Sequence, residues 1–131
     1  MKFILISILP FLFFFVSCDR QTNNATVVNA KHIGKINQTE FAAKLKATPN
    51  AQLIDVRKPK EFTAGKLEGA VNLNYYDKDF SEQIAKLDKD RPVFVYCKSG
   101  GRSGKSTKMM AKMGFKEVYD LAEGYDGWNA K

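Results

Sequence analysis

The chain has 131 residues, of which 44% are hydrophobic and 12% aromatic, enough apolar material for one packed domain rather than a disordered chain. The formal net charge is +7, but the lysines are scattered along the chain and form no basic block. This pattern disfavours nucleic-acid binding and favours a mild preference for small anionic substrates or membrane surfaces.

The N-terminal segment is predicted to lie outside the domain. Lys2 precedes an apolar run over residues 3–16, which is shorter than the about 20 residues that a spanning helix needs. Residues 1–17 are therefore predicted to be a signal peptide, with an uncleaved membrane anchor as the alternative. The segment 15–18, Phe-Val-Ser-Cys, resembles a bacterial lipoprotein box. The resemblance implies cleavage before Cys18, lipidation of Cys18 and an extracytoplasmic protein anchored to the inner or outer membrane of a bacterial cell envelope; the alternative is an ordinary secreted protein.

The next segment and the cysteine count bear on how the domain is attached. Residues 18–32 carry few large apolar side chains and are predicted to be a flexible polar tether. Cys18 and Cys97 are the two cysteines of the chain, and a lipidated Cys18 cannot pair. We therefore expect no structural disulfide, and no resolving partner for dithiol redox chemistry at Cys97.

Strand and helix patterns alternate over residues 33–131, the predicted domain. Strands are predicted at residues 33–36, 52–56, 70–73, 92–96 and 117–119, and helical segments at 37–48, 59–62, 79–87 and 103–113. Residues 124–128 are predicted to close the domain with aromatic side chains. Repeated alternation favours an α/β fold with a mostly parallel sheet covered on both faces. Ligands of such sheets lie at the carboxyl ends of the strands.

Cys97 follows the strand at 92–96 and opens a Gly-rich loop before the helix at 103–113. The first N–H groups of the helix lack partners, and two glycines let further N–H groups turn toward one centre. The positive helix end should lower the pKa of a thiol there from about 8.5 into the range of roughly 3.5–7.5. Cys97 is thus predicted to be an ionised nucleophile, and the alternative is a buried structural thiol.

Three motifs together resemble the rhodanese-like sulfurtransferase domains. The first comprises residues 53–57, 61–62 and 65–72, the second is the loop 97–103, and the third runs from residue 114 to residue 128. The resemblance implies a three-layer α/β sandwich, in which a parallel five-stranded sheet carries helices on both faces. It also implies a reaction that carries a sulfane sulfur as a cysteine persulfide.

The resemblance implies a role for each residue of the site. Cys97 is the nucleophile and sulfur carrier, and backbone N–H groups hold its thiolate and persulfide. Arg102 holds the loop in shape, while Arg57 either lies beside the substrate anion or pairs with Asp55 or Glu61, two carboxylates predicted to give structural support. The residues implied to surround the anion are Lys98, Ser99, Gly100, Gly101, Arg102, Ser103 and Arg57.

The implied reaction is a ping-pong transfer. The Cys97 thiolate takes sulfur from thiosulfate or a persulfide donor, and a thiol or cyanide, or a partner protein that carries a thiol, accepts it. No metal or organic cofactor is expected, because the single histidine, His32, has no neighbouring ligand cluster in the sequence. Two departures from the family pattern are Lys66, where a histidine is common, and Glu123, where a glycine is common.

Two other functions stay open at this stage. A noncatalytic rhodanese-like module could bind a partner or sense a sulfur species, since an exposed reactive thiol is prone to oxidation. A cysteine phosphatase also places a cysteine and an arginine around an anion. Phosphatase loops hold five residues between the two, whereas Cys97 and Arg102 enclose four. The shorter loop favours a sulfur anion over a phosphate.

Overall fold

The computed structural model describes residues 30–129. The predicted signal peptide, the predicted lipidation site Cys18 and the predicted tether up to residue 29 lie outside the described residues. The elements in chain order are β1 (His32–Ile36), α1 (Gln38–Lys46), β2 (Gln52–Asp55), α2 (Pro59–Ala64), β3 (Val71–Asn72), α3 (Phe80–Ala85), β4 (Val93–Tyr96), α4 (Gly101–Lys112), β5 (Glu117–Leu121) and α5 (Gly124–Asn129). None of the helices within this range has the length and apolar character that a membrane crossing requires.

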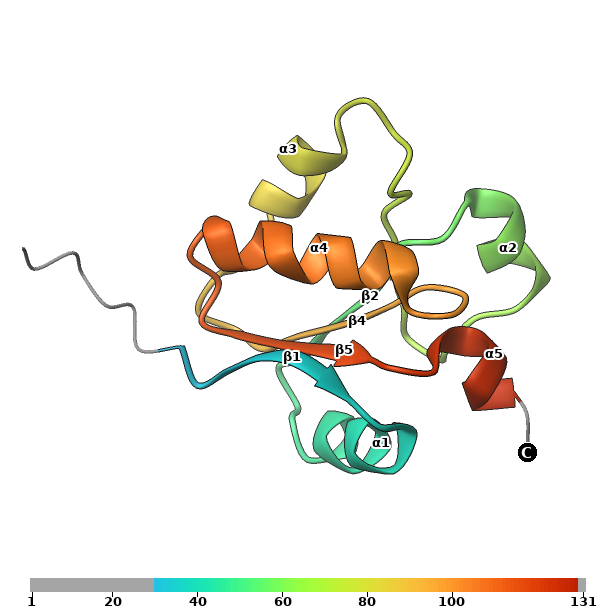
Figure 1. Ribbon diagram of the computed structural model, residues 1–131, viewed down its shortest axis with the longest axis horizontal. Helices are drawn as coiled ribbons and strands as arrows, with labels where there is room; N and C mark the ends of the chain where they lie inside the picture. Colours follow the sequence, from blue (N-terminus) through green and yellow to red (C-terminus); the bar gives the residue numbers. More distant parts are fainter. Residues whose placement is uncertain (1–29, 130–131) are drawn as a thin grey trace, which may run out of the picture.

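The five strands form one sheet in the order β1-β5-β4-β2-β3, and every neighbouring pair is parallel. Helices α3 and α4 cover one face of the sheet, and α1 and α5 lie on the other side (Figure 1). This confirms the predicted α/β fold with a parallel five-stranded sheet between two helical layers. Because β4 lies at the centre, its carboxyl end opens between the loops of its neighbours, where ligands of parallel sheets bind.

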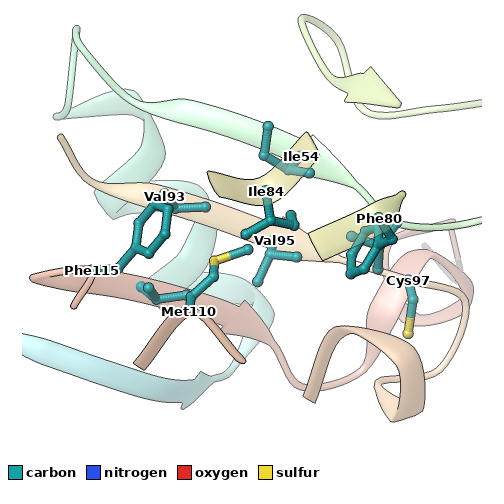
Figure 2. Packing of buried hydrophobic residues seen from close by; sticks show 10 residues of the cluster. Ile54, Phe80, Ile84, Val93, Val95, Cys97, Met110 and Phe115 are labelled. Atoms are coloured by element: carbon teal, nitrogen blue, oxygen red, sulfur yellow. The ribbon is translucent and has the colours of Figure 1, made fainter. Parts of the chain in front are cut away.

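The core divides into two clusters, one on each face of the sheet. Successive side chains of a strand point to opposite faces, so Val95 joins the cluster under α3 and α4 while Phe94 and Tyr96 join the cluster beside α1. Met110 and Phe115 close the first cluster (Figure 2). All four residues of β4 are buried, as a central strand covered on both faces requires.

Among the element boundaries that differ from the sequence prediction, three lie in elements around Cys97 or its neighbouring strands. β1 begins at His32, which the predicted tether includes, because His32 pairs with Glu117 in the parallel ladder. β5 continues to Leu121, two residues beyond the predicted end, and so brings Asp120 into the sheet. α4 begins at Gly101 rather than residue 103. In each case pairing or capping in the folded chain extends an element past the point where its sequence pattern stops.

Candidate active site

Gly100 shapes the loop around the Cys97 sulfur. β4 ends at Tyr96 and places Cys97 at the carboxyl edge of the sheet. Gly100 adopts the left-handed conformation, with φ +100°, and its N–H turns back to donate to Cys97 Sγ at 3.1 Å. A Cβ at Gly100 would lie 2.8 Å from the carbonyl oxygen of Ala122. Both the backbone conformation and the close packing therefore require glycine at this position.

Ser103 in the first turn of α4 and the loop backbone provide the other partners of the sulfur. Ser103 is fully buried, and the Cys97 thiol donates to its Oγ at 3.4 Å. Burial of the thiol opposes its ionisation, but hydrogen bonds from the Ser103 side chain and from the backbone N–H groups of Ser103, Gly100 and Ser99 outweigh burial and lower the pKa of Cys97. The sulfur points away from Phe80 toward this loop (Figure 2). The site thus stabilises a negative charge on sulfur.

α5 supports the loop from the opposite side. The N–H of Tyr125 donates to the carbonyl oxygen of Cys97 at 2.8 Å, and the N–H of Asp126 donates to that of Lys98 at 3.0 Å. Gly124 has φ +63°, and a Cβ there would lie 2.3 Å from the Lys98 carbonyl oxygen. Glu123, which stands where the family commonly has the first glycine of a pair, is exposed. The close approach to the Lys98 carbonyl requires the second glycine, which this chain retains as Gly124.

Arg102 ties the loop to α2. Its guanidinium forms two hydrogen bonds to the Glu61 carboxylate, at 2.7 and 2.9 Å. These bonds from Arg102, opposed by partial burial and helped by the N–H of Lys58, lower the pKa of Glu61 to about 2. The pair joins the first turn of α4 to the first turn of α2, and the guanidinium lies 5.9 Å from the Tyr76 ring centre. Its position is that of a group that holds the loop in shape.

Arg57 lies in a different environment. Its side chain is buried and donates to both carboxylate oxygens of Asp55 and, at 2.6 Å, to the carbonyl oxygen of Gly65. The Tyr125 ring centre lies 4.0 Å from the guanidinium carbon. Of the roles considered for Arg57, the structure shows the pairing with Asp55. The bonds to Asp55 and Gly65 use Nε and Nη2 of the guanidinium, and an anion-binding role for Arg57 stays a prediction.

Three of the expected loop residues face solvent. Lys98, Ser99 and Gly101 are exposed, and the Lys98 ammonium lies 3.8 Å from the Asp126 carboxylate. Such an exposed pair leaves a cationic group at the entrance to the loop. Lys66, the other departure from the family pattern, forms a cation–π contact, with its ammonium 4.3 Å from the Phe62 ring centre.

Sequence reasoning missed two charged residues behind the loop. Asp120 is fully buried in β5, and the Lys35 ammonium lies 3.1 Å from its Oδ2. The same ammonium donates to the carbonyl oxygen of Gly100 at 2.9 Å. The available signal was an acidic residue inside an otherwise apolar run at residues 118–121. It was missed because the strand was predicted to end at residue 119.

Taken as chemistry, the arrangement can form and hold a sulfur anion. The thiol has a lowered pKa, its donors are fixed by backbone geometry before any substrate arrives, and the loop entrance carries a cationic lysine. Preorganised donors of this kind stabilise charge that develops during a reaction. A cysteine of lowered pKa, within a loop of N–H donors at the carboxyl edge of a parallel sheet, defines the class of site.

The chain belongs to the rhodanese-like domain family, whose model matches residues 37–131. Among relatives of known sequence, the thiosulfate sulfurtransferase GlpE of Pseudomonas putida is 34% identical over 92 residues, which cover 70% of this chain and 81% of that protein. The uncharacterized protein YqhL of Bacillus subtilis is 37% identical over 81 residues, which cover 62% of this chain and 63% of YqhL.

Solved structures show the same fold. The human single-domain sulfurtransferase TSTD1 matches with a TM-score of 0.63 at 20% identity, over 74% of this chain and 96% of TSTD1. A rhodanese-related protein from Thermoplasma volcanium matches with a TM-score of 0.63 at 23% identity, over 72% of this chain and 88% of that chain. At these identities the likeness concerns the fold, and the sulfurtransferase family is supported by the sequence relatives.

Proposed function

We propose that the protein is a sulfurtransferase that moves a sulfane sulfur from thiosulfate or a persulfide donor to a thiol or cyanide through a persulfide on Cys97. The observation that carries the proposal is the environment of the Cys97 sulfur. The Gly100 N–H and the Ser103 hydroxyl converge on it, and its pKa is lowered despite burial. A purely structural thiol gains nothing from donors arranged to stabilise its ionised form.

The reaction balances without a redox cofactor. The Cys97 thiolate attacks the outer sulfur of thiosulfate, a new sulfur–sulfur bond forms on Cys97, and sulfite leaves with the electron pair of the broken bond. An acceptor thiolate then attacks the terminal sulfur and releases the Cys97 thiolate, while the acceptor's proton goes to solvent. The charge stays on sulfur throughout, so the same N–H groups serve every step.

The direct test is the intact mass of the protein before and after thiosulfate. The full chain carrying Cys18→Ser has Cys97 as its single thiol. We expect a gain of one sulfur atom, about 32 Da, that a thiol or cyanide removes. Cys97→Ser in the same background gains nothing.

Two results would overturn the proposal. One is the absence of any adduct with thiosulfate, a polysulfide or a low-molecular-weight thiol persulfide, in a protein whose Cys97 still reacts with an alkylating agent. This result would favour a noncatalytic module. The other is phosphate release from an aryl phosphate that depends on Cys97, which would favour a cysteine phosphatase.

The location is a separate part of the proposal. We propose that Cys18 is lipidated and that the domain works outside the cytoplasm, on a polar tether from the inner or outer membrane of a bacterial envelope. The support is the sequence of residues 15–18 after an apolar run. In a bacterial host, Cys18→Ser should move the protein from the membrane pellet to the supernatant after cell fractionation. Continued membrane retention of this variant would contradict the lipid anchor.

A further inference from the structure

A cleft of about 600 Å³ between β1 and α4 takes no part in the proposed chemistry. Its volume lies within the range of roughly 300–1,000 Å³ that sites for small molecules have. Gly100 contributes to its wall, whereas Cys97 does not. This space, which we call the β1–α4 cleft, is therefore separate from the surroundings of the sulfur, although the two share part of the active-site loop.

Small residues leave the β1–α4 cleft open. Gly34 in β1 and Gly100, Gly101 and Gly104 at the start of α4 all line it. A Cβ at Gly101 would have no side chain or distant backbone atom within 4 Å, and a Cβ at Gly34 would lie 3.9 Å from Nε2 of His32. Because backbone forms much of the wall, few flexible side chains must be ordered when a ligand binds, and this lowers the cost of binding.

The polar groups on the inner wall already have partners or are out of reach. The Thr107 hydroxyl donates to the carbonyl oxygen of Ser103 at 2.9 Å. The Lys35 ammonium donates to the carbonyl oxygen of Gly100 at 2.9 Å and lies 3.1 Å from the Asp120 carboxylate, whose charge it offsets. The Asp120 side chain itself is fully buried. An occupant of the cleft therefore meets few polar groups on this wall that it must satisfy.

Two lysines give the β1–α4 cleft a positive rim. Lys105 and Lys108 of α4 line it and are exposed, and neither forms a salt bridge with any residue between 30 and 129. Ile33 of β1 and Ala111 of α4 add apolar surface that is at least partly exposed. Apolar walls with a few charged groups are typical of ligand sites. Here the charge complements an anion, and the walls complement an apolar body.

We propose that the β1–α4 cleft binds a small organic anion, whose apolar body lies against Ile33 and Ala111 and whose carboxylate, or a similar group, pairs with Lys105 and Lys108. Such a ligand would lie against Gly100, the residue whose N–H donates to the Cys97 sulfur at 3.1 Å. The site goes beyond the proposed function, because it requires neither the thiol nor sulfur transfer.

A second hollow, of about 460 Å³, adjoins the same two lysines. Its other walls are Tyr75, Lys112 and the methionines Met109 and Met113. Ordering long flexible side chains costs conformational entropy, so this hollow is a poorer site than the glycine-walled cleft. Lys112 lines the second hollow and not the β1–α4 cleft, and it therefore provides a control on the same helix.

The first test locates the ligand. The full chain carrying Cys18→Ser and Cys97→Ser is titrated with octanoate below its micelle-forming concentration, and backbone amide resonances are followed by NMR. We expect saturable shifts at Gly34, Gly104 and Ala111, which line the cleft. Octanamide, the neutral counterpart of the same length, should bind about fivefold more weakly, because it cannot pair with the lysines. Equal affinity for the two probes would overturn the proposal.

The pattern of shifts also decides between sites. Shifts confined to Met109, Lys112 and Met113 would place octanoate in the second hollow, and shifts centred on Ser99 and Ser103 would place it in the sulfur-binding loop. Either pattern, or the absence of saturation, would overturn the proposal. Because Cys97 is absent from the protein used, this outcome does not depend on whether the parent forms a persulfide.

The second test removes the charges of the rim. Lys105→Gln with Lys108→Gln should lower the affinity for octanoate about fivefold and leave the affinity for octanamide nearly unchanged. The matched control Lys112→Gln should change the affinity for octanoate less than about twofold, since its ammonium does not line the cleft. Equal losses in the double variant and in the control would show a general charge effect and overturn the proposal.

The third test fills the cleft. Ala111→Trp introduces a large side chain at the exposed apolar wall, and we expect it to lower the affinity for both probes about tenfold or more. Circular dichroism checks that the variant is folded. A folded Ala111→Trp that binds octanoate as the parent does would overturn the proposal. If this variant fails to fold, the exposed lysine substitutions still decide the outcome.

Discussion

Two arginine–carboxylate pairs lie near the carboxyl edge of the sheet, and they differ in burial and in how far apart the two partners are in the sequence. Asp55 and Arg57 are two residues apart, and their side chains are 0% and 4% exposed. Glu61 and Arg102 are 41 residues apart in the chain, and their side chains are 29% and 17% exposed. The first pair completes the end of β2, whereas the second joins α2 to the nucleophile loop.

The difference shows how burial divides similar chemistry into separate tasks. The Arg57 guanidinium is buried, and Asp55, Gly65 and the Tyr125 ring contact it in place of water. Arg102 keeps part of its surface in solvent and joins the loop after Cys97 to α2 through Glu61. The role of an arginine is therefore not determined by its position in a motif. It is determined by the groups that the fold places in contact with it.

The largest expected effect is on the buried pair. Asp55→Asn leaves the Arg57 charge buried without a counter-ion, and we expect a loss of about 3 kcal/mol in the free energy of unfolding. Urea unfolding followed by circular dichroism measures it. The double variant Asp55→Asn with Arg57→Gln removes both charges and should lose less than Asp55→Asn alone. A double variant that is equally or more destabilised would show that the unpaired charge is not the cause.

A smaller effect is expected at the loop-spanning pair. Glu61→Gln removes a partly exposed ion pair, and we expect it to cost about 1 kcal/mol or less. High salt should reduce this loss, because solvent ions screen the pair, and should leave the loss at Asp55 nearly unchanged. The comparison is made by urea unfolding of both variants at low and high salt. Equal salt dependence would contradict the contrast in burial.

The smallest expected effect is the change with pH in what the Arg102–Glu61 pair contributes to the free energy of unfolding. Arg102 lowers the pKa of Glu61 from 4.5 to about 2 in the folded protein, so folding favours the ionised form. Its contribution to stability is complete above pH 4.5 and is lost as the pH falls toward 2. The difference in the free energy of unfolding between the parent and Glu61→Gln should stay constant down to about pH 4.5 and then fall toward zero at lower pH. A difference that persists at pH 2 would contradict the pairing.

Much of the fold was predictable because its signals are local. The alternation of apolar runs with capped helical segments indicated the strands and helices, and the cap predicted around residues 37–39 is confirmed by Asn37, whose Oδ1 accepts from the N–H of Glu40 at 2.9 Å. The boundaries were less predictable. β5 gains Asp120 because its neighbour β1 supplies a paired strand and Lys35 supplies a counter-charge.

The site shows the same division. Residues 93–112 show a strand pattern, then a cysteine, a Gly-rich loop and a helix pattern. Because the first N–H groups of a helix lack partners, this order predicts N–H groups around the sulfur. The choice of Asp55 rather than Glu61 as the partner of Arg57 could not be read in this way, because both carboxylates lie within four residues of it.

The amino-acid order alone determined that one α/β domain carries a single thiol at the carboxyl end of a central strand, since backbone conformation, helix capping and apolar periodicity act over a few residues. Only the tertiary structure decided which charges meet. Asp120 and Lys35 reach the back of the loop, and Gly124 reaches its underside, from strands and turns remote in the chain. Such contacts depend on the strand order β1-β5-β4, which places β5 beside the nucleophile's strand and which no local pattern encodes.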